Sequence, residues 1–308
     1  MAVKQAHFNF ETTITLPSGQ VVLQDWGSET APVVICLHGW LDNLASFYPL
    51  AEELAQDFHL LLVDLPGHGR AEPLPVGGHY YIWQNIELLQ QLLVQQNITQ
   101  VHLLGHSMGG VIASLFAGTF SDQVSSLLLL DSLGPMVDNA KDAPKQLAKA
   151  ILDEQRPNSP LRIFPTLDEA LAARKKSSPD MSDKALLPIV ERNLKTVTGG
   201  YSWSTDIRLR QSSKIRLTEA QVEGFFRGIM APVQLILADQ GIIPKPWLEK
   251  RKTYLANVSQ ATVKGHHHFH AELEGVQQSA LLIRDFILSV IADSCSSPSS
   301  NTCASEPN

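Results

Sequence analysis

Short runs of apolar residues recur along the chain, and each run stops where glycine or polar residues begin. The five clearest runs are Val33–His38, His59–Asp64, Val101–Gly105, Val124–Asp131 and Val233–Ala238. Uninterrupted apolar runs of this length predict strands that are buried on both faces, as in a parallel sheet.

Helical patterns fill the intervals between these runs, at Phe47–Gln56, Trp83–Gln96 and Met108–Phe120. Strands that alternate with helices predict a doubly wound α/β sheet with right-handed crossovers. Ahead of the first run, Glu11–Leu16 and Gln20–Trp26 flank a Pro-Ser-Gly turn and predict an N-terminal hairpin.

The alternation breaks after Asp131 for about 85 residues. This stretch contains helical patterns at Pro144–Glu154, Leu167–Lys176 and Lys184–Val197, and no convincing buried strand. We therefore expect a helical cap, inserted after strand 6, over the carboxyl edge of the sheet.

The sheet pattern resumes at Val233, after a helix that the capping-box spacing of Thr218 and Gln221 predicts. We therefore assign 1–134 and 218–293 to one α/β core and 135–217 to the cap. The Ser-rich and Pro-rich residues 294–308 are expected to be a disordered tail.

Composition narrows the class of protein. The chain has 308 residues, of which 44% are hydrophobic and 18% charged, and a net charge of −7, as expected for a globular enzyme. The sequence has no Lys or Arg cluster of the kind that binds nucleic acid or an anionic membrane. It also has no apolar run long enough to span a membrane. The composition does not predict an oligomeric state.

Cysteine usage and the N-terminal residues bear on the cellular compartment. Cys36 lies inside an apolar run, where we expect a buried thiol, whereas Cys295 and Cys303 lie in the polar tail. This distribution argues against a disulfide framework. Residues Met1–Glu11 do not resemble a secretory signal, so we expect a cytoplasmic location.

The pattern G-x-S-x-G occurs at Gly105–Gly109, between a predicted strand and a predicted helix. In this context a serine lies on a strained strand-to-helix turn, with its hydroxyl exposed at the sheet edge. Ser107 is therefore the predicted nucleophile. In hydrolases with this elbow, the residue after the serine and the loop after an earlier strand donate backbone N–H groups to the oxyanion. Here these residues are Met108 and Trp40.

From Ile14 to Ile291 the chain resembles the α/β-hydrolase superfamily. Within it, His38–Asn43 (HGWLDN), Gly199–Tyr201 and Asp206–Arg210 resemble the serine hydrolase-like proteins and their bacterial esterase relatives. The resemblance implies the α/β-hydrolase fold and a histidine base after the last strand.

The histidine that the resemblance implies falls in the run His266–His270. In the family this histidine commonly precedes a glutamate by five residues and a second histidine by three. His267 satisfies both with Glu272 and His270, and His266 is the alternative base.

The acid of the predicted triad lies between the serine and the histidine in this family's chain order. Its common position follows the strand Val233–Ala238, typically as G-x-x-D, but this chain has glycine there and Asp239 two residues earlier. Asp131, at the end of the preceding strand, is the other position that the fold uses. We favour Asp131 and keep Asp239 as the alternative.

These residues predict a serine hydrolase that cleaves carboxylic esters of small to medium acyl chains through an acyl-enzyme. A carbon–carbon bond hydrolase, a lactonase or a thioesterase is the alternative within enzymes, and a small-ligand receptor with vestigial hydrolysis is the alternative outside them. We expect no cofactor and no metal. A small ester is the expected partner, with His38, Gly39, His106 and Trp203 as candidate substrate contacts.

Overall fold

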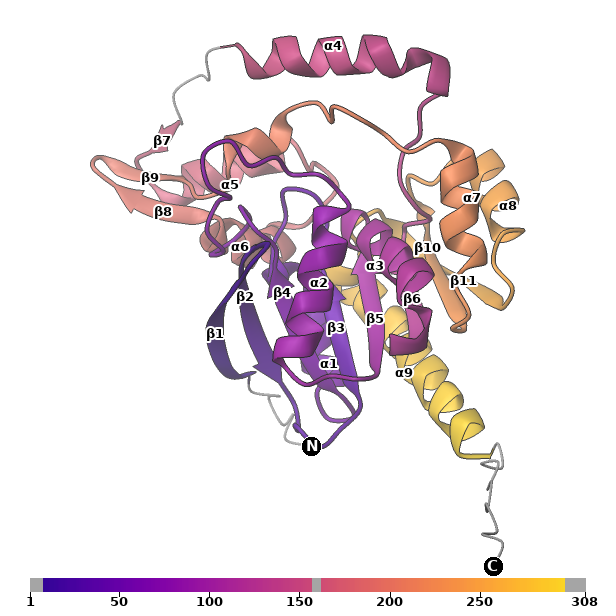
Figure 1. Ribbon diagram of the computed structural model, residues 1–308. Helices are drawn as coiled ribbons and strands as arrows, with labels where there is room; N and C mark the ends of the chain where they lie inside the picture. The colour runs from indigo at the N-terminus through magenta and orange to yellow at the C-terminus, as the bar shows by residue number, and fades with distance from the viewer. Residues whose placement is uncertain (1–7, 157–161, 297–308) are drawn as a thin grey trace, which may run out of the picture.

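A computed structural model of the protein describes residues 8–156 and 162–296, and its main feature is an eight-stranded sheet (Figure 1). The strands of this sheet are β1 (Phe8–Leu16), β2 (Gly19–Trp26), β3 (Val33–Leu37), β4 (His59–Asp64), β5 (Val101–His106), β6 (Val124–Leu130), β10 (Val233–Gln240) and β11 (Val258–His266). Their order in the sheet is β1-β2-β4-β3-β5-β6-β10-β11. Strand β2 pairs antiparallel with β1 and β4, and the other pairs are parallel. The predicted fold class is confirmed.

Helices cover both faces of this sheet and bury its apolar strands. One face packs against α2 (Gln84–Gln95), α3 (Met108–Thr119) and α7 (Glu219–Arg227). The other face packs against α1 (Tyr48–Leu54) and α9 (Leu273–Ser296), which is drawn in yellow in Figure 1. The strands are buried on both sides, which explains why their sequences are continuous apolar runs.

Six further helical elements in the described ranges have three to eight residues each. They are α8 (Lys245–Lys252), η1 (Leu44–Phe47), η2 (Ser121–Gln123), η3 (Ala140–Asp142), η4 (Ile207–Arg210) and η5 (Phe269–Ala271). The capping box at Thr218 and Gln221 is present at the start of α7. The periodicity analysis did not predict α8, whose eight residues have few apolar positions.

The segment between β6 and α7 is not purely helical, which corrects the prediction. It contains α4 (Ala143–Glu154), α5 (Leu167–Lys175) and α6 (Asp183–Arg192). It also contains a three-stranded antiparallel sheet of β7 (Ile163–Phe164), β8 (Leu194–Val197) and β9 (Gly200–Trp203), in the order β7-β9-β8. These strands have two to four residues, too few to give a strand pattern in the sequence.

One predicted helix of this segment, Lys184–Val197, ends earlier than expected. The helix stops at Arg192, and the chain turns from β8 into β9 at Gly199 and Gly200, where φ is +90° and +136°. Glycine adopts such angles without a steric penalty, so the pair favours a hairpin here over a longer helix.

At the carboxyl end, α9 extends to Ser296, past the expected boundary at Asp293. The rest of the predicted tail and Cys303 lie outside the described residues. Cys36 is buried and Cys295 is exposed, each as a free thiol. Among residues 8–156 and 162–296, no helix is both long enough and apolar enough to cross a membrane.

Candidate active site

Ser107 lies between β5 and α3 in a backbone conformation that L-amino acids rarely adopt, with φ 50° and ψ −115°. Two glycines of the motif are required because other backbone lies where their side chains would be. A Cβ at Gly105 would lie 2.5 Å from the backbone of Gly109, and a Cβ at Gly109 would lie 1.9 Å from the carbonyl oxygen of Leu37. The G-x-S-x-G spacing therefore follows from the close contact of α3 with β5 and β3.

Hydrogen bonds join this elbow to the end of the neighbouring strand β6. The N–H of Ser107 donates to the carbonyl of Leu130 (3.2 Å), and the hydroxyl of Ser132 donates to the carbonyl of Ser107 (2.7 Å). Asp131 lies between Leu130 and Ser132, directly after the end of β6. The serine and the favoured acid are thus positioned by the same pair of strand ends.

Asp131 is 1% exposed and has a positive φ of 42°. One carboxylate oxygen, Oδ2, lies 2.6 Å from Nδ1 of His267 and also accepts the backbone N–H of Ile242 (3.0 Å). An imidazole whose Nδ1–H donates to a buried carboxylate has its Nε2 free to accept a proton. This is the arrangement that an acid and a base need in a hydrolase triad.

The alternative acid, Asp239, lies elsewhere. Its side chain is exposed, and Oδ1 accepts the backbone N–H of Gly265 (2.8 Å). The position two residues later, Gly241, has no room for a side chain because a Cβ there would lie 2.2 Å from Oδ1 of Asp131. The absence of a side chain at position 241 therefore leaves the space that the carboxylate of Asp131 occupies.

The two candidate bases also differ in their contacts. Nδ1 of His266 accepts the backbone N–H of His268 (3.1 Å), and its Nε2 lies 3.7 Å from Glu272. The structure thus brings His267, and not His266, to Asp131. Glu272 itself accepts the backbone N–H of Ser182 (2.6 Å), which attaches the histidine loop to the segment between α5 and α6.

His106, the residue before Ser107, holds the loop that carries His267 next to the nucleophile. Nε2 of His106 donates to the backbone carbonyl of His267 (2.9 Å), and the two rings lie with centroids 4.6 Å apart. No hydrogen bond joins the Ser107 hydroxyl to the His267 ring in the described ranges. Such contacts are commonly long in ligand-free hydrolases and tighten when substrate binds.

The two expected oxyanion donors are the backbone N–H groups of Trp40 and Met108. Within the part of the chain that the structure describes, neither group donates a hydrogen bond. Met108 is the first residue of α3, where an N–H has no partner inside the helix. The indole of Trp40 donates to the carbonyl of Leu209 (2.9 Å), so its loop is attached to η4. Both groups are therefore available to a ligand.

Ser107 and Asp131 line a cavity of about 510 Å³ whose wall is mainly apolar. This volume is typical of small-molecule sites, which range from about 300 to 1,000 Å³. Its apolar side chains include Met108, Val111, Leu133, Leu217, Ile243 and Trp247. The wall also includes the charged side chain of Arg216, which lies 3.6 Å from Asp138.

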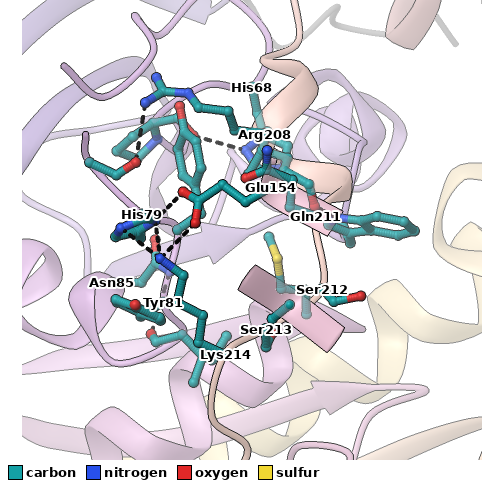
Figure 2. A pocket seen from close by; sticks show the side chains of 18 residues that line it. His68, His79, Tyr81, Asn85, Glu154, Arg208, Gln211, Ser212, Ser213 and Lys214 are labelled. Atoms are coloured by element: carbon teal, nitrogen blue, oxygen red, sulfur yellow. Dashed lines mark hydrogen bonds and ion pairs between the residues drawn. The ribbon is translucent and has the colours of Figure 1, made fainter. Parts of the chain in front are cut away.

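A second, polar cavity of about 180 Å³ shares Trp40, Tyr81 and Met108 with the first. Figure 2 shows Glu154, His79 and Lys214 close together in its wall. Lys214 lies 2.8 Å from a Glu154 carboxylate oxygen and 3.0 Å from Nε2 of His79. Because these groups neutralise one another, the polar cavity does not present a free charge from this cluster.

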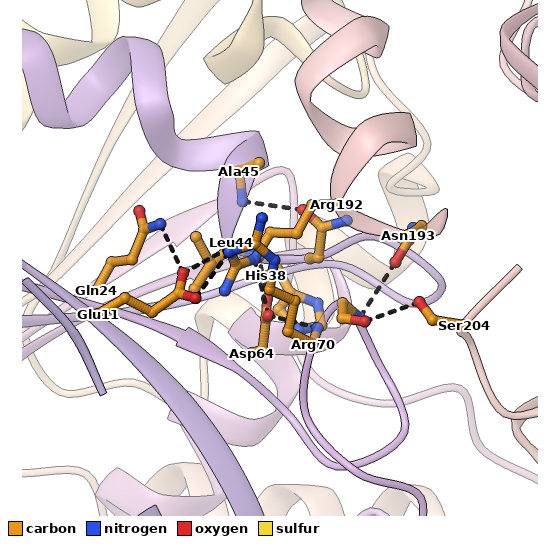
Figure 3. Close-up of polar contacts among 12 residues, drawn as sticks. Glu11, Gln24, His38, Leu44, Ala45, Asp64, Arg70, Arg192, Asn193 and Ser204 are labelled. Atoms are coloured by element: carbon orange, nitrogen blue, oxygen red, sulfur yellow. Dashed lines mark hydrogen bonds and ion pairs between the residues drawn. The ribbon is translucent and has the colours of Figure 1, made fainter. Parts of the chain in front are cut away.

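Buried ion pairs fix the segment that carries α6 against the core (Figure 3). Arg192 is 4% exposed, and its guanidinium lies 2.8 Å from Asp64 and 2.7 Å from Glu11. Asp64 also accepts the backbone N–H groups of Leu44 (2.8 Å) and Arg70 (2.9 Å). Removing one member of such a buried pair typically costs about 3–5 kcal/mol, so the pairs of Arg192 hold the end of α6 against the sheet.

The four expected substrate contacts lie outside the cavity that contains Ser107. His38 is fully buried, with Nδ1 donating to the Gly39 carbonyl (2.8 Å) and Nε2 accepting the N–H of Leu65 (3.2 Å). Gly39 and His106 lie behind the elbow, and Trp203 lines a separate cavity beside Leu41. None of these four residues lines the cavity of Ser107, and their role as substrate contacts stays a prediction.

Sequence reasoning missed a buried group of side chains behind the elbow. Asp42 is 1% exposed and lies 3.3 Å from His268, and Arg174 donates to its other oxygen (2.5 Å). Burial alone would raise the pKa of Asp42, but His268 and Arg174 hold it well below its ordinary value. Burial also holds the pKa of His106 far below its usual range, so this ring is neutral. The only sequence signal was the Asp-Asn pair that ends HGWLDN.

Comparisons with known proteins agree with this architecture. The profile of the alpha/beta hydrolase fold family matches residues 32–231, which include Ser107 and Asp131. A serine hydrolase-like protein of Danio rerio is 27% identical over 94% of this chain and 92% of that protein. A probable serine hydrolase of Drosophila melanogaster is 31% identical over 84% of this chain and 82% of that protein.

Solved structures and a shorter match add to this comparison. A hypothetical protein of Pseudomonas aeruginosa has a TM-score of 0.86 and 32% identity, covering 90% of this chain and 99% of that chain. A pimeloyl-[acyl-carrier protein] methyl ester esterase of Aeromonas salmonicida is 39% identical over 33% of this chain and 38% of that protein. The resemblance to serine hydrolase-like proteins and to a bacterial esterase is thereby confirmed.

Proposed function

Because the chain belongs to the α/β-hydrolase family and is similar to serine hydrolase-like proteins over most of its length, we propose that it cleaves carboxylic esters of small to medium acyl chains. The proposed triad is Ser107, His267 and Asp131. The observation that supports it most is the 2.6 Å contact between His267 and the buried Asp131, beside the strained elbow of Ser107.

In the proposed first step, the Ser107 hydroxyl attacks the ester carbonyl while Nε2 of His267 takes its proton. The tetrahedral oxyanion accepts hydrogen bonds from the backbone N–H groups of Trp40 and Met108. Loss of one such donor typically costs about 3 kcal/mol of transition-state stabilisation. The alcohol then leaves with the proton that His267 returns, and the acyl group stays on Ser107.

In the proposed second step, His267 takes a proton from a water molecule as that water attacks the acyl carbonyl. Collapse of the second tetrahedral intermediate returns the proton to Ser107 and releases the carboxylic acid. Asp131 holds the imidazole in the tautomer with the proton on Nδ1 and favours the imidazolium that forms in each step.

The substrate class follows from the cavity beside Ser107. A mainly apolar wall favours an ester whose acyl or alcohol part is apolar, because its burial there removes apolar surface from water. The similarity of part of this chain to a methyl ester esterase also supports an ester over other acyl derivatives.

The test is hydrolysis of p-nitrophenyl acetate, butyrate and octanoate by the wild-type protein and Ser107→Ala. We expect turnover by the wild type, and a loss of at least about 10³-fold in kcat in the variant, because the nucleophile is gone. A covalent acyl adduct on Ser107, seen by intact mass, would support the acyl-enzyme. Undiminished hydrolysis by Ser107→Ala would contradict the nucleophile.

A second panel distinguishes the type of bond that is cleaved. It compares each p-nitrophenyl ester with the thioester of the same acyl group and with a lactone of similar size. We expect the highest kcat/KM for the oxygen esters. Turnover of thioesters or lactones alone, lost in Ser107→Ala, would retain the triad and overturn the proposed substrate class.

A further inference from the structure

Three side chains behind the elbow direct ligand atoms toward one another. They are Asp42, His106 and His268, and one atom of each lies within 4.8 Å of the corresponding atoms of the other two. Asp42 and His106 are almost fully buried, whereas the His268 side chain is 18% exposed. The triad residues are not in this set, but each of these three residues is close in sequence to a member of the active site.

The protonation state of His106 follows from its hydrogen bond. Its Nε2 lies 2.9 Å from the carbonyl oxygen of His267, and a carbonyl can only accept, so Nε2 carries the proton. Nδ1 then has a lone pair. That nitrogen is buried and has no hydrogen-bond partner among the described residues.

The carboxylate of Asp42 has one occupied oxygen and one that lacks a hydrogen bond. Oδ1 accepts from Arg174 (2.5 Å), whereas Oδ2 is buried and makes no hydrogen bond in the described ranges. Oδ2 lies 3.3 Å from Nε2 of His268. This contact is an ion pair only while His268 is protonated, and with a neutral His268 the buried oxygen has lost its hydration without a charged partner in return.

Gly39 lies against both Oδ2 of Asp42 and Nδ1 of His106. A Cβ at Gly39 would lie 2.9 Å from Nδ1 of His106 and 3.1 Å from Oδ2 of Asp42. Glycine at position 39 avoids this double contact, since it has no Cβ. Two electron-pair donors that lie close together in a buried site repel each other, and a cation bound by both relieves that repulsion.

We propose that Asp42, His106 and His268 bind one divalent transition-metal ion such as Zn²⁺. Imidazole and carboxylate are usual zinc ligands, with bonds of about 2.0–2.2 Å. Oδ2 of Asp42 and Nε2 of His268 are already 3.3 Å apart, as two ligands of one ion would be, whereas the wider spacings in the set, all within 4.8 Å, must contract when the ion binds. A water molecule that enters beside the partly exposed His268 completes the coordination.

The contacts around the three ligands match those that support metal sites. The N–H of His106 donates to the His267 carbonyl, which fixes the ring and its tautomer, and Arg174 orients the Asp42 carboxylate. The ion joins the loop after β3, the elbow and the histidine loop. Its binding therefore stabilises the folded state through three active-site loops.

The test uses the full chain, purified without a histidine tag and treated with a chelator, and titrates it with Zn²⁺ by calorimetry. Co²⁺ absorption reports the ligand field. We expect one ion per chain, a higher Tm with Zn²⁺, and visible Co²⁺ bands of a four- or five-coordinate site. His268→Gln is the first variant, because its partly exposed side chain can change without opening the core.

His268→Gln should weaken Zn²⁺ binding at least about 10- to 100-fold, with loss of the Tm increase and of the Co²⁺ bands. Asp42→Asn should act in the same direction. The matched control is His79→Gln, which removes a histidine from the polar cavity and should leave binding unchanged. No binding by the wild type, or equal binding by His268→Gln, would overturn the proposal. Since binding is measured, the result is independent of the proposed ester hydrolysis.

Discussion

Two neighbouring strands, β6 and β10, run parallel and each ends close to an aspartate, but the two carboxylates have different surroundings. Asp131 after β6 is buried and lies 2.6 Å from His267. Asp239 on β10 is exposed and accepts one backbone N–H from Gly265. The difference shows that the position of an aspartate in the fold determines whether its carboxylate can reach the histidine. Here the residue at position 241 matters most, because it lies directly against the carboxylate of Asp131.

Position 241 couples the two strand ends. Its glycine lies against the carboxylate of Asp131, so a side chain at 241 requires that carboxylate to move. An aspartate at both positions would also place two negative charges together in a buried site, which is unfavourable. This part of the chain therefore has room for one carboxylate beside His267, and the proposed acid is Asp131, directly after β6.

The sharpest test of this comparison is Asp131→Asn. We expect kcat to fall by about 10⁴-fold, because a neutral amide no longer holds His267 in the productive tautomer or favours the imidazolium. The measurement is p-nitrophenyl butyrate turnover, with circular dichroism to show that the variant is folded. A folded Asp131→Asn protein with near wild-type kcat would contradict the assignment of the acid.

The sequence predicted the features of the fold that depend on local patterns. Continuous apolar runs identified the five parallel strands that were named, and the strand–motif–helix order identified the elbow of Ser107. The small sheet of β7, β8 and β9 was missed because strands of two to four residues have no period to detect.

The site was less predictable because its contacts join residues that are far apart in the chain. The choice between Asp131 and Asp239 depended on the space beside Gly241, which no local pattern reports. The partner of His268 is Asp42, on a loop at the opposite end of the sequence, so the histidine run alone could not reveal it. Packing decides such pairs, and the sequence indicates only the candidates.

The next largest effect is expected from Gly241→Ala. The new Cβ would lie 2.2 Å from Oδ1 of Asp131, so the carboxylate must shift away from its position beside His267. A displacement of this kind should lower kcat by about 10- to 100-fold, with a smaller change in KM. Steady-state kinetics on the same ester measures both constants.

The matched control for this substitution is Gly224→Ala. Gly224 lies in α7, and a Cβ there meets nothing within 4 Å. This variant should keep wild-type kcat and gain up to about 1 kcal/mol in stability, because alanine is the better helix former. Equal kcat for Gly241→Ala and the wild type would show that the site at 241 tolerates a side chain.

The comparison can also be reversed by moving the acid from β6 to the loop after β10. Asp131→Gly removes the carboxylate and relieves a positive φ, and adding Gly241→Asp supplies a carboxylate from the neighbouring strand. We expect the double variant to have roughly tenfold higher kcat than Asp131→Gly alone, since general-base catalysis is partly restored. Equal kcat in the two variants would mean that position 241 cannot orient the histidine.

The smallest effect is expected from Asp239→Asn, which tests the other side of the comparison. The amide oxygen of asparagine can still accept the N–H of Gly265, and the charge that is lost is exposed and screened by solvent. We therefore expect kcat/KM to stay within about threefold of the wild-type value. Asp239→Ala, which removes the acceptor at the start of the histidine loop, should cost more activity than Asp239→Asn. If Asp239→Asn instead lost as much kcat as Asp131→Asn, the exposed carboxylate would have to swing toward His267 during turnover, and the assignment of one acid to β6 would be wrong.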